Sequence, residues 1–274
     1  MIVDAHHHFW KFDPVRDTWI TPDMRAIRRD FLPRDLKPVL AANGVDECVT
    51  IQVNQSEQET EAMLAFADEH EFIAGVVGWV DLRAKDLDER LDRLKRSPKL
   101  KGFRHIVQGE PAGFLLQKDF IEGVRLLQRY GFTYDLLVYH HQLSEALQFV
   151  NQLPEVKIVV DHIAKPSIRT GEKTDWELNM AAIATFENVY CKISGMVTEA
   201  DWENWRFTDF SPYLDEVVEA FGTERLMYGS DWPVCLVAAS YEQQLNIVQT
   251  YFSKFSAAEK RAVMGENASR FYNL

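Results

Sequence analysis

Eight short runs of β-branched, aliphatic and aromatic residues recur along the chain, and a segment with helical periodicity follows each of them. The runs lie at residues 2 to 6, 47 to 53, 73 to 81, 101 to 107, 133 to 139, 157 to 162, 189 to 194 and 226 to 230. In the segments between them, apolar residues repeat at i, i+3 or i+4 and i+7, which is one face of a helix. Eight alternations of strand and helix predict a closed parallel (β/α)8 barrel of the TIM type rather than an open doubly wound sheet.

The 274 residues are expected to form one barrel domain, 1 to 274, because no Gly/Ser/Pro-rich linker divides them. Two connections, 9 to 31 and 195 to 212, are too long for simple turns and carry several aromatic side chains. Both follow the carboxyl end of a predicted strand, where barrel enzymes build their active sites. We expect them either to wall or cover a pocket, or to pack their aromatic residues onto the barrel rim.

Charge and apolar patterning exclude several classes of partner. Thirty basic residues against forty-two acidic ones leave a net charge of -12, which repels nucleic acid and anionic membranes. No stretch approaches the roughly eighteen apolar residues of a membrane span, and no basic and apolar leader begins the chain. We therefore expect a cytoplasmic protein whose partner is a small molecule. The three cysteines, Cys48, Cys191 and Cys235, are far apart and are expected in the core. The oligomeric state stays open, a homodimer included.

The first predicted strand ends in a histidine pair, His6 and His8. In a strand, side chains at i and i+2 emerge on the same face about 7 Å apart, so both imidazoles can meet one metal ion or one substrate. Taken alone, the pair also fits satisfied core histidines or a surface histidine run.

Polar and ionisable residues fall at the carboxyl ends of most of the predicted strands, which meet at one mouth of a parallel barrel. They are His6 and His8 (first), Arg104 and His105 (fourth), His140 or His141 (fifth), His162 (sixth), Ser194 (seventh) and Asp231 (eighth). Because a buried charge is unfavourable unless it is paired or functional, this clustering predicts an active site at that mouth.

Two imidazoles and a carboxylate, with His162 as a further imidazole, form a donor set suited to zinc, manganese or iron. Such a site keeps one position open for water, and Asp231 can take a proton from that water, which indicates hydrolysis. Asp231 alone would equally fit a turn or helix cap, and His162 a core histidine.

Further side chains are expected to contact substrate. Arg104 and Lys165 are the cations that strand placement puts near the pocket, where each can polarise a carbonyl or hold a hydroxyl or carboxylate. The alternatives are a structural ion pair for Arg104 and a surface position for Lys165. We also assign His105, Trp10 and Trp232 to the substrate-binding set.

Three segments in this order resemble the amidohydrolase superfamily of the amidohydrolase-2 type, in its sugar-lactonase branch. They are Asp4-Ala-His-His-His-Phe-Trp10, Asp161-His-Ile-Ala-Lys-Pro166 and Tyr228-Gly-Ser-Asp-Trp-Pro-Val234, and the final Gly265 to Tyr272 also looks like the family's last helix.

The resemblance implies a distorted barrel and definite site roles. His6 and His8 would be first-strand metal ligands, His162 the sixth-strand histidine and Asp231 the eighth-strand acid or base. Binuclear members bridge two metals with a fourth-strand lysine or glutamate, whereas Arg104 and His105 stand here, so one divalent ion, zinc first, is expected rather than two. The sugar-lactonase branch also allows hydrolysis without a metal.

The leading functional hypothesis is hydrolysis of an aldonolactone, such as L-fuconolactone or L-rhamnonolactone, to its aldonic acid, with Asp231 as general base and His162 as a second catalytic group. One alternative is a metal-dependent decarboxylase or C–C hydrolase acting on a small carboxylic acid. Another is a barrel that binds a small molecule without catalysis.

Overall fold

One sheet of eight parallel strands, ordered as in the sequence, forms the centre of the computed structural model, which describes residues 1–274. The strands are β1 (Val3–His7), β2 (Glu47–Ile51), β3 (Ile73–Gly78), β4 (Leu100–Ile106), β5 (Thr133–Leu137), β6 (Ile158–Val160), β7 (Val189–Ile193) and β8 (Leu226–Tyr228). Each predicted run overlaps one strand, which confirms the (β/α)8 prediction.

The barrel closes through a few contacts at its carboxyl end rather than through a full ladder between β8 and β1. His7 and Trp232 form an isolated parallel bridge. The amide of His8 donates to the carbonyl of Trp232 at 2.7 Å, and the amide of Asp231 donates to the carbonyl of His6 at 2.8 Å. The closing contacts therefore bring the ends of the first and last strands together at the predicted mouth.

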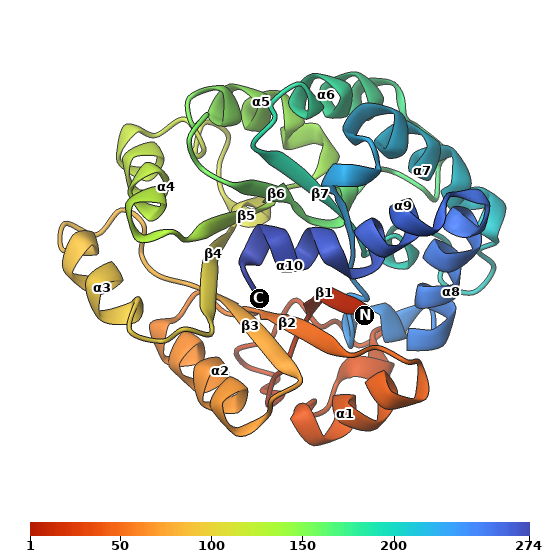
Figure 1. The fold of residues 1–274 in the computed structure, drawn as a ribbon, viewed down its shortest axis with the longest axis horizontal. Helices are drawn as coiled ribbons and strands as arrows, with labels where there is room; N and C mark the ends of the chain where they lie inside the picture. The colour runs from red at the N-terminus through yellow and green to blue at the C-terminus, as the bar shows by residue number, and fades with distance from the viewer.

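Helices surround the strand ring, as Figure 1 shows. They are α1 (Pro33–Ala42), α2 (Glu57–Glu69), α3 (Leu87–Leu94), α4 (Lys118–Tyr130), α5 (Leu143–Asn151), α6 (Thr174–Ala184), α7 (Phe207–Phe221), α8 (Tyr241–Tyr251), α9 (Ala257–Arg261) and α10 (Asn267–Tyr272). In α4 the predicted apolar face, including Phe120 and Leu127, is buried, and the helix ends at Gly131, whose positive φ of 76° suits glycine. None of these helices has the length and apolar character needed to cross a membrane.

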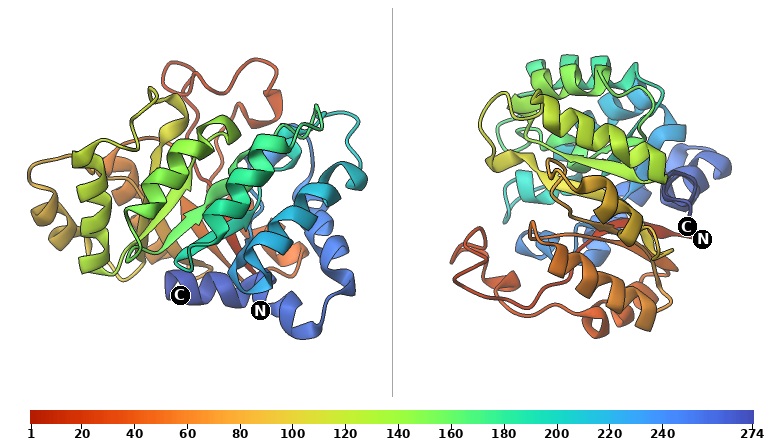
Figure 2. Two further views of the ribbon diagram at one scale, coloured as in Figure 1. Left: turned by 90° about the horizontal axis from the view of Figure 1, so that it is seen from above. Right: turned by 90° about the vertical axis from the view of Figure 1, so that its left-hand side faces the viewer.

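The barrel interior is apolar at the amino end of the strands, and the C-terminal helix α10 covers this end. Val3, Ala5, Val49, Val159 and Met227 pack there with side chains of α10. Figure 1 shows α10 lying across the centre of the ring, and the left panel of Figure 2 puts the red loop of residues 9 to 31 at the opposite end. The polar side chains of the interior thus lie above this apolar layer, from the middle of the strands to their carboxyl ends.

Candidate active site

A β-bulge in β1 turns His6 into the barrel. Asp4 pairs with Cys48 and His7 with Thr50, so β1 holds one residue more than β2 between these pairs. Val3 and Ala5 face the inner apolar cluster, and strict alternation would send the next-but-one position, His7, inward. The extra residue shifts this alternation by one position, because a bulge re-aims the side chains that follow it. His6 and His8 consequently share the inner face, as the spacing predicts.

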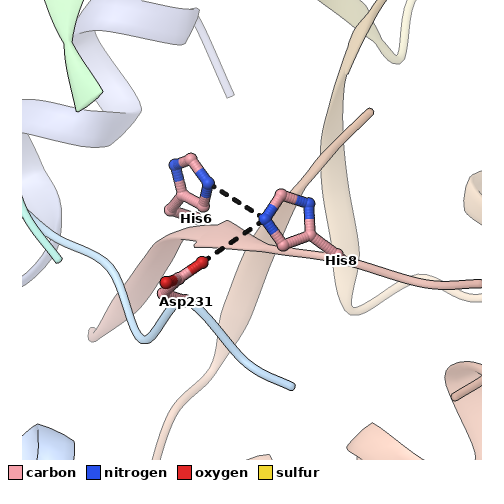
Figure 3. Close-up of side chains that lie close together, drawn as sticks. All are labelled: His6, His8 and Asp231. Carbon is pink, nitrogen blue, oxygen red and sulfur yellow. Dashed lines mark hydrogen bonds and ion pairs between the residues drawn. The ribbon is translucent and has the colours of Figure 1, made fainter. Parts of the chain in front are cut away.

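The ring nitrogens of His6 and His8 face one another at 3.2 Å, Nε2 to Nε2 (Figure 3). His8 Nδ1 lies 2.8 Å from the carbonyl oxygen of Ile51, which can only accept, so Nδ1 carries a proton and the neutral ring presents its lone pair at Nε2. Burial, with help from the Lys192 ammonium, lowers the pKa of His6 well below its ordinary value. His6 is therefore a neutral imidazole, the form that binds metal, and the Nδ1–H tautomer of His8 directs its second ring nitrogen toward the same point.

Asp231 follows β8 in a left-handed conformation, with φ 57°, and is almost fully buried. Its Oδ1 lies 3.4 Å from His8 Nε2 and 4.0 Å from His162 Nε2. The structure thus brings together the four residues assigned to metal binding and catalysis, His6, His8, His162 and Asp231.

His162 and Lys165 project from an unusual turn after β6. Four consecutive residues, His162 to Lys165, have φ between 47° and 58°, a region that costs a non-glycine residue about 1–2 kcal/mol. The indole of Trp176 donates to the carbonyl of Ile163 at 2.7 Å, and His162 Nδ1 pairs with Ser194 Oγ at 2.8 Å. Burial and the neighbouring His6 lower the pKa of His162 well below its ordinary value, so this imidazole is also neutral.

The donor set fits a zinc ion. In a tetrahedral site with metal–ligand distances of about 2.0–2.1 Å, neighbouring donor atoms are about 3.3 Å apart. His8 Nε2 lies 3.2 Å from His6 Nε2 and 3.4 Å from Asp231 Oδ1, and all three atoms lie within 4.8 Å of one another. With His8 in its neutral Nδ1–H form, its lone pair and the Asp231 carboxylate face each other as two acceptors, an arrangement that a cation satisfies.

A second set of potential ligands, His6, Asp161 and His162, is less suited to a metal. The carboxylate of Asp161 is already paired with Arg104 at 3.0 Å and with Lys192 at 3.0 Å. These cations outweigh burial and hold the pKa of Asp161 below its ordinary value.

Arg104 lies at the cavity floor, but its N–H groups are committed to protein acceptors. Nε and Nη2 donate to the side chain of Gln52, and Nη2 also donates to the Gln52 carbonyl. Nη1 donates to Asp161 Oδ2 at 3.0 Å and lies 3.3 Å from His6 Nε2. The structure therefore places Arg104 against His6 and in a buried ion pair with Asp161.

Lys192, in the middle of β7, completes this buried polar layer and was missed from the sequence. Its Nζ lies 2.5 Å from Asp135 Oδ2, 3.0 Å from Asp161 Oδ1 and 3.2 Å from His6 Nδ1, and the side chain is fully buried. Tyr272 of α10 donates to Asp135 at 2.7 Å. A lysine inside the apolar run Val189-Tyr-Cys-Lys-Ile193 was the available signal, because a covered strand rarely holds an unpaired charge.

A cavity of about 420 Å³ opens above these residues, a volume in the range of small-molecule sites. His8, Arg104, His162, Lys165 and Asp231 line it together. The two long connections supply part of the wall, as expected, in the form of Trp19, Met24, Thr198, Glu199 and Trp202. A more open hollow beside α2 holds Arg90 and Arg93, whose charges are paired with Glu57, and it contains none of the predicted site residues.

Three residues assigned to substrate binding lie outside the cavity lining. His105 alternates with Arg104 along β4, so its ring faces outward, where it stacks on Phe114 at 4.8 Å and pairs with Glu110. Trp10 and Trp232 are buried and both pack on Phe31. None of these three side chains therefore faces the cavity, and the packing of Trp10 matches the alternative in which the loop aromatics pack onto the barrel rim.

A model of the amidohydrolase family matches residues 3–274. An L-fucono-1,5-lactonase of Burkholderia multivorans is 38% identical, over 99% of this chain and 96% of that protein, and an L-fucono-1,5-lactonase of Burkholderia ambifaria is 35% identical, over 99% and 95%. A crystal structure of an amidohydrolase from Burkholderia multivorans with bound zinc is 37% identical, covers 100% of this chain and 99% of its own, and superposes with a TM-score of 0.97.

Proposed function

We propose that this chain, which belongs to the amidohydrolase family and is a lactone-hydrolysing enzyme, acts on a sugar lactone. The proposed substrate is an aldonolactone such as L-fuconolactone or L-rhamnonolactone, and the product is its aldonic acid. The observation that carries this proposal is the convergence of Asp231 with His8 and His162, at 3.4 and 4.0 Å, in the lining of a cavity of about 420 Å³, which has room for a sugar ring.

In the proposed reaction Asp231 is the general base. Its carboxylate removes a proton from water as the water oxygen attacks the lactone carbonyl carbon. The bond between that carbon and the ring oxygen then breaks, and Asp231 returns the proton to the departing oxygen. The product is an open chain with a free hydroxyl group and a carboxylic acid, and at neutral pH this acid releases its proton to the solvent and becomes a carboxylate.

His162 is proposed to stabilise the oxygen that becomes negative. When the Ser194 hydroxyl donates to Nδ1, the proton of the neutral imidazole sits on Nε2, which faces the cavity beside Asp231. A donor held there can bond to the carbonyl oxygen as charge develops on it. Because the left-handed turn fixes the ring, this donor is in place before the reaction begins.

One divalent ion, zinc first, is proposed to be held by His6, His8 and Asp231, and when bound it would polarise the carbonyl and lower the pKa of water. The chain's own residues keep the ligands ready: the Ile51 carbonyl fixes the tautomer of His8, and Asp161 lies 3.3 Å from His6 Nδ1.

The cations of the cavity favour a neutral substrate over the carboxylic acid of the decarboxylase alternative. Arg104 directs four of its five N–H groups to Gln52 and Asp161, and the charge of Lys165 is balanced by Glu199 at 2.9 Å. A substrate carboxylate would therefore meet no cation whose charge is unbalanced, whereas a lactone needs none.

The test is proton release across a panel of aldonolactones, with and without chelator, for the wild type and Asp231→Asn. We expect wild-type turnover and a loss of about 100- to 10,000-fold in the variant, the usual contribution of a general base, with its thermal transition retained. Near-native hydrolysis by Asp231→Asn would refute the assignment, and binding without turnover on every lactone would favour a non-catalytic barrel.

A further inference from the structure

Lys165 and Glu199 form an ion pair on the wall of the cavity. Lys165 Nζ donates to Glu199 Oε1 at 2.9 Å, and the hydroxyl oxygen of Thr198, which has the Gly195 carbonyl as a nearer acceptor at 2.7 Å, lies 3.2 Å from the same carboxylate oxygen. Both charged side chains line the cavity that holds Asp231. The ion pair is thus part of the wall of the candidate active site, although no sequence pattern identifies Glu199 as a site residue.

Each partner keeps hydrogen-bonding capacity that the protein does not use. Glu199 Oε2 accepts no hydrogen bond, and Lys165 Nζ makes only the one bond to Glu199. Their side chains are 16% and 23% exposed, for Lys165 and Glu199 respectively, so they reach the cavity without being free in solvent. Burial disfavours the ammonium, but the carboxylates of Glu199 and Asp231 outweigh it and raise the pKa of Lys165. The wall therefore presents free donors beside a free acceptor.

The position of Lys165 is fixed by backbone rather than by a flexible surface loop. It is the last residue of the left-handed turn that also carries His162, and its amide donates to the His162 carbonyl at 2.8 Å. Strain of this kind persists only where the surrounding structure enforces it, and it gathers at functional sites. The turn sets the separation between the proposed oxyanion donor and the ion pair.

Aromatic faces complete the surroundings of the pair. Trp19, Tyr139 and Trp202 line the same cavity, and Trp19 and Tyr139 are 41% and 37% exposed. A sugar ring presents apolar C–H faces and a rim of hydroxyl groups, so it matches a chamber with aromatic walls and one polar edge.

We propose that Lys165 and Glu199 are a hydroxyl-recognition subsite that binds two neighbouring hydroxyl groups of the lactone ring. One hydroxyl accepts from Lys165 Nζ, and its neighbour donates to Glu199 Oε2. Glu199 is then a specificity-determining residue that makes the enzyme select polyhydroxylated lactones over unsubstituted ones. The inference rests on the proposed function, because it takes a sugar lactone as the substrate.

The test compares L-fucono-1,5-lactone with δ-valerolactone, which has the same ring size and no hydroxyl group. We measure the ratio of kcat/KM for the two lactones in the wild type, in Glu199→Gln and in a matched control, Glu203→Gln, an exposed position of the same loop. Loss of one bond between a hydroxyl and a charged group should lower the ratio by about 10- to 100-fold in Glu199→Gln. Glu203→Gln should keep the wild-type ratio.

A parallel binding measurement separates this inference from the proposed function. Calorimetry with L-fucono-1,5-lactam and δ-valerolactam should show the same loss of preference in Glu199→Gln without any turnover. An unchanged ratio, or an equal fall on both lactones, overturns the subsite. If the wild type prefers the hydroxylated lactam but hydrolyses no lactone, the proposed reaction fails and the subsite stands; if it binds neither lactam with preference, the subsite fails.

Discussion

Acidification from pH 7.5 to 5.5 should weaken the fold of the metal-free protein, because three histidines are buried as neutral groups. Burial is the main cause that lowers the pKa of His6, His7 and His162 well below 6.5. In the unfolded chain the same imidazoles take up protons as the pH falls through 6.5. The unfolded state then binds more protons than the folded state, so the free energy of unfolding is largest above pH 6.5 and decreases below it.

The size of this loss follows from linkage. Each histidine that stays neutral in the folded state lowers the free energy of unfolding by about 1.4 kcal/mol between pH 7.5 and 5.5, so three of them lower it by about 4 kcal/mol. Buried carboxyl groups act in the opposite sense, because burial raises the pKa of Glu59 and raises that of Asp4 and of Asp135 from 3.8 to about 6, so the folded state protonates these two aspartates first over this interval. Protonation of Asp4 and protonation of Asp135 each raise the free energy of unfolding by about 0.8 kcal/mol over this interval, so the expected net decrease is about 2–3 kcal/mol.

Urea unfolding in EDTA, followed by tryptophan fluorescence at the two pH values, measures this difference. His7→Asn should reduce it by about 1.4 kcal/mol, and Asp4→Asn should increase it by about 0.8 kcal/mol. Each variant is compared with itself at the two pH values, so a loss of stability common to both cancels. A free energy of unfolding that is constant or larger at pH 5.5 would refute the reasoning, and so would variants that shift the difference in the same direction.

Two further substitutions test the packing around His162 and the buried ion network. Lys192→Met leaves the carboxylates of Asp135 and Asp161 without their shared cation and should lower the free energy of unfolding, measured with urea, by about 3–5 kcal/mol. A decrease of less than about 1 kcal/mol would contradict the ion-pair description. Gly195→Ala places a methyl group 2.6 Å from His162 Nδ1, at a backbone φ of 61°, and should displace the imidazole. We expect kcat on the best lactone to fall about 100-fold while the protein still folds. A variant with wild-type kcat would show that the position of His162 is unimportant.

Much of this architecture is readable from the sequence, because barrel strands and helices have strong periodic signals. All eight strands lie where apolar runs predict them, and the residues that end the first, sixth and eighth strands meet at one mouth. Where the side chains expected in the pocket differ from those that line it in the structure, the reason is side-chain direction. Arg104 and His105 are adjacent in one strand, so alternation allows only one of them to face inward, and both were assigned to the pocket.

Other features depend on backbone geometry that residue types do not report. The bulge in β1 decides that His6 rather than His7 faces inward, and nothing in three consecutive histidines distinguishes them. The left-handed turn of His162 to Lys165 contains no glycine, so the usual sequence signal for positive φ is missing. Glu199 becomes a cavity residue only through the path of its loop.

The buried network of Arg104, Lys192, Asp135 and Asp161 is best explained by what it does to His6. Four buried charges are a poor source of stability, since well-packed apolar side chains of similar volume are often equally stabilising. Two cations balance two carboxylates here, and three of the four groups contact the His6 ring: Lys192 at 3.2 Å and Asp161 at 3.3 Å from Nδ1, and Arg104 at 3.3 Å from Nε2. A ring held from both edges has one orientation, and that orientation aims Nε2 at His8. Apolar replacements could preserve the barrel, but they would release the histidine on which the proposed metal site depends.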